Sequence, residues 1–230
     1  MTRQPNRWLG NRDPIDRSFE SRQFVDEILA ELAAGRFGPS AWVTFLGRSL
    51  ARSVDQVRKR PGVAVEVTAL HLLAGRGVSR RWTFASWFMC ITHLGLLGER
   101  TTLGWPNRLT LVRALLPTLA PASRWTSIVA LATDFADGHL ARMGHESTFG
   151  AFADPMADGI FWSWYALRWE RNPWLRWVPI ALLAGSSAGI AVAYFARGRT
   201  IDYPRPLAVR YASAGAQALL TLRSLRSVAR

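Results

Sequence analysis

Hydrophobic and polar positions divide the chain into an amphipathic beginning and a more apolar remainder. Between residues 18 and 32 the apolar side chains recur every three or four positions, which predicts an amphipathic helix. Gly35 and the Gly38-Pro39 pair are expected to end this helix. Residues 41–58 repeat the pattern with arginines added and predict a second helix. This second helix either belongs to a small soluble unit or presents a basic surface to anionic lipid.

Later segments lack charge over lengths that approach a membrane span. Residues 82–98 contain seventeen positions without a formal charge, and residues 177–196 contain twenty. A helix of ~20 apolar residues crosses the hydrocarbon core of a bilayer. Shorter apolar runs occupy 114–123, 125–133, 159–167 and 207–222. The pattern favours an all-α fold, a polytopic membrane bundle of about 4–6 transmembrane helices, over a soluble helical bundle.

Charge is distributed unevenly along the chain and suggests two regions. Residues 1–80 form a basic, mostly helical N-terminal extension, expected on the cytoplasmic side, and residues 81–225 form the membrane-embedded domain. The formal net charge of +13 over 230 residues indicates an anionic partner, either nucleic acid, an acidic membrane surface or a phosphate-bearing substrate. One cysteine excludes an intramolecular disulfide and a zinc site built from cysteines.

Four carboxylates gather between apolar flanks at residues 134–158, namely Asp134, Asp137, Asp154 and Asp158. Residues three or four apart share a helix face, so each pair of aspartates is expected to line one helix. The short connection at 143–149 predicts two antiparallel neighbouring helices whose acidic faces meet at the end of the bundle. Carboxylates this close repel one another unless positive charge lies between them. Oxygen ligands suit hard divalent ions, so we predict a site for Mg²⁺ or Mn²⁺ that holds two ions.

Residues around the carboxylates suggest the substrate chemistry. Gly138 and Gly150 have no side chain, which leaves room for a substrate beside the backbone. Arg142 offers a planar fork of donors suited to phosphate, and Arg113 places a charge inside an apolar helix, where ionisable residues are functional by default. Paired metals and an arginine indicate displacement at a diphosphate.

The same residues form a recognisable motif. Asp134-x-x-Asp137-Gly138-x-x-Ala141-Arg142, followed by Gly150-x-x-x-Asp154-x-x-x-Asp158, resembles the signature of the CDP-alcohol phosphotransferases at all eight fixed positions. Residues 106–113, with Pro106, Asn107, Leu109, Thr110 and Arg113, resemble the helix that precedes this signature. Residues 149–158 look most like the phosphatidylglycerophosphate synthase branch, although that branch generally has lysine where this chain has Gly159. The resemblance covers about residues 105–200.

The resemblance implies an integral membrane enzyme, usually a homodimer, in the cell membrane with its active site facing the cytoplasm. An acceptor alcohol, here expected to be glycerol 3-phosphate, attacks the diphosphate of a CDP-linked lipid such as CDP-diacylglycerol and releases CMP. Asp134, Asp137 and Asp154 would bind the metals, and Asp158 would complete the second metal site and act as general base. The residues implied to contact the cytidine nucleotide are Gly138, Ala141, Arg142 and Gly150.

Two other functions are consistent with parts of the sequence. A membrane prenyltransferase also uses helical aspartate pairs and Mg²⁺ on a diphosphate, but Gly138, Ala141 and Arg142 argue against it. A non-catalytic protein could bind nucleic acid or anionic lipid through its basic N-terminal region, with a degenerate membrane domain as its anchor. The intact aspartates argue against such a loss of catalytic function. Lipid substrates and membrane lipids are therefore the expected partners, and nucleic acid is not.

Overall fold

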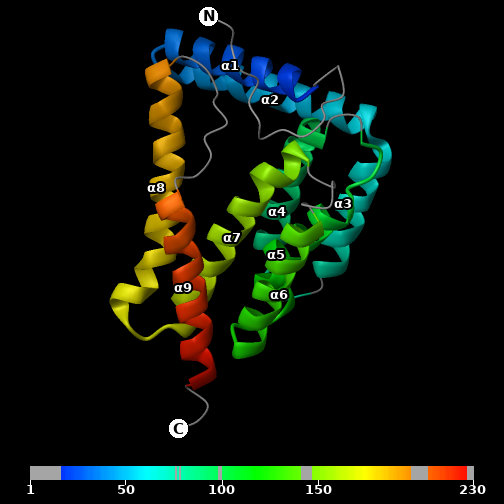
Figure 1. The fold of residues 1–230 in the computed structure, drawn as a ribbon. Helices are drawn as coiled ribbons and strands as arrows, with labels where there is room; N and C mark the ends of the chain where they lie inside the picture. The colour runs from blue at the N-terminus through cyan, green and yellow to red at the C-terminus, as the bar shows by residue number, and fades with distance from the viewer. Residues whose placement is uncertain are drawn as a thin grey trace, which may run out of the picture.

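The computed structural model describes residues 17–75, 77, 79–97, 100–140, 147–197 and 207–226. Within these ranges the chain is helical and forms no strand, which confirms the all-α class (Figure 1). The helices in chain order are α1 (Arg17–Ala34), α2 (Pro39–Lys59), α3 (Pro61–Ala74), α4 (Arg80–Thr92), the 3₁₀ turn η1 (Leu94–Leu97), α5 (Trp105–Leu119), α6 (Arg124–Leu140), α7 (Thr148–Trp169), α8 (Pro173–Arg197) and α9 (Leu207–Arg226).

The break between α1 and α2 falls where the sequence predicts it, but the glycines have another role. Arg36 and Phe37 adopt positive φ angles of 50° and 55°. A Cβ atom on Gly35 would lie 2.5 Å from the Cβ of Ala41. Gly35 is therefore required for the close approach of the two helices, and Pro39 starts α2 at a position where its missing N–H costs nothing.

The uncharged run at 82–98 does not form one helix. α4 ends at Thr92, His93 caps it, and the chain turns through η1. Thirteen helical residues extend about 20 Å, too short for a single crossing of a bilayer. α4 instead packs against α3, a helix that the sequence pattern did not predict.

α5 lies at the centre of the bundle and packs against both α6 and α7. α6 and α7 are antiparallel, because Ala130 of α6 packs in a cluster with Phe161 and Tyr165 of α7, whereas Asp134 lies near Asp154. The predicted orientation is therefore correct. The two helices are not close neighbours along their length, however, since α6 packs mainly on α5, and α7 packs on α5 and α8.

Of the described helices, α8 is the one long and apolar enough to cross a membrane by length and composition. Only 11% of its most apolar window is buried inside the protein, so most of α8 is available to lipid or to a second chain. Trp174 and Trp177 near its start are exposed, as interfacial aromatic residues would be. Trp162 is buried and belongs to the core of the bundle.

α1 and α2 lie side by side across one end of the bundle and run crosswise to α8 (Figure 1). They meet the C-terminal end of α8, where the Tyr194 hydroxyl donates a hydrogen bond of 3.3 Å to the backbone carbonyl of Asp26. Phe37 and Phe195 form an edge-to-face pair with ring centroids 5.7 Å apart. The pair of helices is thus attached to the end of the helix most able to span a membrane.

Candidate active site

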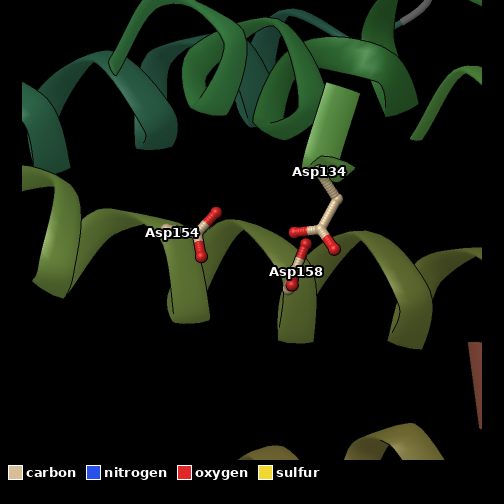
Figure 2. Close-up of side chains that lie close together, drawn as sticks. All are labelled: Asp134, Asp154 and Asp158. Carbon is tan, nitrogen blue, oxygen red and sulfur yellow. The ribbon is translucent and has the colours of Figure 1, made fainter. Parts of the chain in front are cut away.

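The three predicted aspartates whose side chains the structure describes come together. Asp134 projects from α6 toward Asp154 and Asp158, which lie one turn apart on α7 (Figure 2). Each offers a carboxylate oxygen, and these oxygens all lie within 4.8 Å of one another. Asp134 is six residues from the end of α6, so the cluster lies about 9 Å below that end rather than at the end of the bundle.

Arg113 of α5 binds all three carboxylates. Its guanidinium is completely buried, with Nε 2.7 Å from Asp158 and Nη1 3.4 Å from Asp134, and Nη2 donates a hydrogen bond to Asp154. A charge removed from water needs close partners, and a guanidinium fork can serve several carboxylates at once. The charged residue that the sequence placed inside an apolar helix is therefore part of the aspartate cluster.

The start of α7 is fixed against α5 by a small polar network. Ser147 caps α7, with its Oγ accepting a hydrogen bond of 2.9 Å from the backbone N–H of Gly150. The same hydroxyl donates to Oδ1 of Asn107 at 3.1 Å, and Nδ2 of Asn107 donates to the carbonyl of Leu103 at 2.6 Å. This network fixes the position of Asp154, one helical turn further along α7.

Gly150 is part of this contact. A Cβ atom there would lie 2.7 Å from Oδ1 of Asn107 and 3.2 Å from Oγ of Ser147. Glycine thus allows the close approach of α7 to α5, in addition to any role at a substrate. The sequence contained both Asn107 and Gly150 in the motif, but nothing in the local pattern indicated that they touch.

The start of α5 is also held by a residue that sequence analysis missed. Glu66 of α3 accepts a hydrogen bond of 3.0 Å from the backbone N–H of Leu103 and pairs with Arg108. Val63 and Val67, on the same helix, pack in the core cluster that contains Leu111 of α5 and Phe149 of α7. An acidic residue in an otherwise apolar helix was the available signal for this contact.

The structure describes the predicted nucleotide contacts only in part. Gly138 is half-buried in the last turns of α6, and Asp137 lies one residue before it in the same helix. Ala141 and Arg142 fall outside the described residues.

Gly159 follows Asp158 directly and packs against α8. A Cβ atom at this position would meet the Leu183 side chain, with Cδ1 at 2.6 Å and Cγ at 3.2 Å. A larger side chain would require Leu183 or α8 to move. Gly159 therefore allows α8 to lie close behind the aspartate cluster.

Comparison with known proteins identifies the family. The sequence pattern of the CDP-alcohol phosphatidyltransferase family matches residues 103–222, from two residues before the start of α5 to the last turns of α9. The chain belongs to this family. No curated protein and no solved structure shows significant similarity to the chain. CDP-alcohol phosphatidyltransferases transfer a phosphatidyl group from a CDP-alcohol, are generally membrane enzymes and are generally dependent on Mg²⁺ or Mn²⁺.

The aspartate cluster fits such a metal. It offers hard oxygen ligands from three side chains within 4.8 Å of one another, which suits Mg²⁺ or Mn²⁺. Asp154 and Asp134 keep 38% and 32% of their side-chain surface exposed, so an ion and a substrate can reach them. Asp158 is more enclosed, at 12%.

Proposed function

We propose that the protein transfers a phosphatidyl group from a CDP-linked lipid such as CDP-diacylglycerol to an acceptor alcohol in phospholipid biosynthesis. The observation that carries the proposal is the meeting of Asp134, Asp154 and Asp158 around the buried Arg113, within the matched family region. The proposed acceptor is glycerol 3-phosphate, as in the phosphatidylglycerophosphate synthase branch. The lysine usual in that branch is absent at Gly159, so inositol phosphate and serine are included in the test.

In the proposed reaction the acceptor hydroxyl oxygen forms a bond to the phosphorus that carries the diacylglycerol. The bond from that phosphorus to the bridging oxygen breaks, and CMP leaves with the electron pair. Asp158 accepts the hydroxyl proton on a carboxylate oxygen. Its enclosed position and its contact with Nε of Arg113 hold this carboxylate in one orientation, as a general base requires.

Asp134, Asp137, Asp154 and Asp158 would hold two divalent ions. Bound Mg²⁺ or Mn²⁺ neutralises the diphosphate and favours departure of CMP. Gly138, Ala141, Arg142 and Gly150 would contact the cytidine nucleotide. The four carboxylates and the Arg113 guanidinium together carry a net charge of −3. Without divalent cations, this site would repel an anionic diphosphate.

We further propose a polytopic membrane domain over residues 81–225, with residues 1–80 as its cytoplasmic extension. The domain would lie in the cell membrane as a homodimer with its active site toward the cytoplasm. The length and exposed apolar surface of α8 support a membrane location.

The test is metal-dependent release of CMP by the purified protein in nanodiscs. CDP-diacylglycerol is supplied with each acceptor in turn, in the presence of Mg²⁺, Mn²⁺ or EDTA. We expect release with one acceptor, its loss in EDTA, and at least a 100-fold lower rate for Asp158→Asn. Asp55→Asn, the same substitution on the exposed surface of α2, is the matched control and should leave the rate unchanged.

Two results would contradict the proposal. Turnover of a prenyl diphosphate, with no CMP release for any acceptor, would assign the site to a prenyltransferase. Full activity of Asp158→Asn would show that Asp158 is not the general base.

A further inference from the structure

α2 carries an apolar stripe that the other described helices leave exposed. Val43, Leu46, Leu50 and Val54 follow one another at spacings of three and four residues, so they lie along one side of the helix. Their exposed fractions are 71%, 54%, 50% and 49%. Four large apolar residues in a row on one helix side form a contiguous patch, which marks an interaction surface.

The other sides of α2 have partners in the protein. Arg48 and Arg52 stack on Phe24 of α1, and Arg48 also pairs with Glu27 and Glu31 of that helix. Ser53 and Gln56 are buried where α2 packs on α4 and η1. By helical geometry the stripe lies about 180° from Arg52 and therefore faces away from α1.

The orientation of α2 is that of a helix in the plane of a membrane. α2 runs crosswise to α8, whose length and composition fit a membrane span (Figure 1). The pair α1–α2 meets α8 at its C-terminal end, beside the half-exposed rings of Phe37 and Phe195. The end of a spanning helix lies near the membrane surface, and an amphipathic helix there can place its apolar side at the boundary between headgroups and acyl chains.

Charge and neighbouring surface both fit a bilayer. α2 contains four basic residues and one acidic residue, and Arg58 lies about 80° from the centre of the stripe. Basic residues beside an apolar helix side attract anionic headgroups. On α3, which follows after Arg60, the exposed residues Val65, Leu72 and Leu73 provide a further apolar surface.

We propose that α2 docks on the surface of an anionic lipid bilayer, with Val43, Leu46, Leu50 and Val54 inserted at the boundary between headgroups and acyl chains. Docking would hold the α1–α2 pair flat on the membrane and would fix the depth at which the protein is inserted in the bilayer. The inference goes beyond the proposed function and depends only on the membrane location of α8.

Spin labels at single cysteines test this docking in the full-length protein. Cys90 is buried and is replaced in a Cys90→Ala background. Labels are attached at Leu46→Cys and Leu50→Cys on the stripe, and at Thr44→Cys as the matched control. Thr44 is also exposed on α2 but lies about 120° around the helix from the centre of the stripe.

In nanodiscs that contain phosphatidylglycerol we expect the two stripe labels to be accessible to oxygen and protected from a water-soluble nickel complex. The Thr44→Cys label should show the reverse. In nanodiscs of neutral lipid, the protection of the stripe labels should fall at least twofold. Thermal unfolding of each variant confirms that it is folded before the labels are compared.

Three outcomes would overturn the inference. Access of the nickel complex to both stripe labels would place α2 in water. Spin–spin coupling between labels on different chains would assign the stripe to an interface between copies. Equal protection of the stripe labels in neutral and anionic lipid would show that headgroup charge does not contribute to docking. CMP release, measured on the same samples, tests the proposed function separately, because a variant can fail either assay and pass the other.

Discussion

Arg113 contributes a permanent positive charge to a site built from carboxylates. Its guanidinium reaches Asp134, Asp154 and Asp158 at the same time, and no part of its side chain is exposed. A divalent ion bound to the same oxygens would share their negative charge with Arg113. We therefore expect Arg113 to stabilise the metal-free protein and to lower the affinity of the site for metal.

This balance predicts opposite effects of Arg113→Met on stability and on the response to metal. Removal of one partner from a buried charge cluster costs about 3–5 kcal/mol, so unfolding in EDTA should occur at a lower temperature than in the wild type. The rise in unfolding temperature on addition of Mg²⁺ should be larger in the variant, because metal then provides the missing charge. Thermal unfolding of detergent-solubilised protein measures both quantities.

Arg113→Lys is the companion variant, because it keeps the charge but lacks the planar fork. We expect it to fall between the wild type and Arg113→Met in both measurements. An unchanged unfolding temperature for Arg113→Met in EDTA would show that the guanidinium does not stabilise the cluster.

Gly150 is the second residue at which atomic packing decides the site. In Gly150→Ala the added Cβ would meet Oδ1 of Asn107, which is itself held by hydrogen bonds and cannot easily move. The start of α7 must then shift, and Asp154 with it. Because catalytic geometry tolerates little displacement, CMP release should fall about 10- to 100-fold.

Gly47→Ala is the matched control for this substitution. Gly47 lies within α2, and an added Cβ there meets nothing within 4 Å. Activity should be unchanged and the helix slightly more stable, since alanine favours helix by about 1 kcal/mol over glycine. Equal activity of the wild type and Gly150→Ala would mean that the contact with Asn107 does not position α7.

At the scale of elements, Glu170 joins the end of α7 to α9. The carboxylate is buried and accepts two hydrogen bonds from Arg223, from Nε at 2.7 Å and from Nη2 at 3.0 Å. It also accepts one from the backbone N–H of Asn172 at 2.8 Å. Burial opposes ionisation, but the bonds from Arg223 and Asn172 outweigh it and hold the pKa of Glu170 below its usual range.

The lowered pKa fixes the sign of a pH effect. A carboxyl group with a lower pKa in the folded protein stabilises it above the unfolded pKa of about 4.3, and the stabilisation is lost as the pH falls. We expect Glu170→Gln to lower the unfolding temperature by about 3 °C at pH 7. The difference from the wild type should shrink as the pH falls below about 4.3 toward the lowered pKa of Glu170.

The comparison of the two proteins at each pH removes the effect of the other titrating groups. A difference that persists unchanged at pH 3.5 would contradict the role of the ionised carboxylate. Arg223→Gln should reproduce the loss at pH 7, and the double variant should add little to it.

The sequence predicted those elements whose local pattern is sufficient to define them. α1 and α2 follow from helical periodicity, and α8 follows from an uncharged run of twenty residues. α3 was missed because its apolar residues surround the helix and show no single polar side. The turn after Thr92 was missed because an uncharged run does not reveal where a helix ends.

The candidate site could be predicted in its residues but not in its arrangement. Helical spacing and the motif identified Asp134, Asp154 and Asp158, which do come together. The sequence did not indicate that α5 lies between α6 and α7, because contacts between distant segments leave no local signal. For the same reason Arg113 was noted as a buried charge without its partners, and the bond between Asn107 and Ser147 was not foreseen.

At the scale of the whole molecule, α3 and α4 would determine on which side of the proposed membrane domain the N-terminal helices lie. They pack together as a helical hairpin, and Gly77 in the turn between them lies against Thr118, near the far end of α5. The chain therefore enters the bundle along α3 and returns along α4. Because α3 and α4 run in opposite directions, the chain returns to the side on which it entered. α1 and α2 therefore lie on the side where α5 begins, whether or not the α3–α4 hairpin reaches the far surface.

This arrangement predicts which surface residues are accessible from each side of the membrane. Single cysteines are introduced in the Cys90→Ala background at three exposed positions, Ser40 in α2, Arg197 at the end of α8 and Arg171 in the α7–α8 turn. A membrane-impermeant maleimide is then applied to sealed vesicles of known orientation. Ser40→Cys and Arg197→Cys should react from the same side, because α2 lies at the C-terminal end of α8 (Figure 1). Arg171→Cys should react from the other side, since α8, which is long and apolar enough to cross a membrane, lies between the two positions.

The opposite result would have a specific structural meaning. If Ser40→Cys and Arg197→Cys reacted from different sides, residues 82–97 would have to cross the bilayer as a single extended span. That crossing would separate α2 from Tyr194 and Phe195 and break the contacts that join α1–α2 to α8. Labelling of all three cysteines from one side would instead mean that α8 does not span, and would remove the membrane topology on which the position of the site depends.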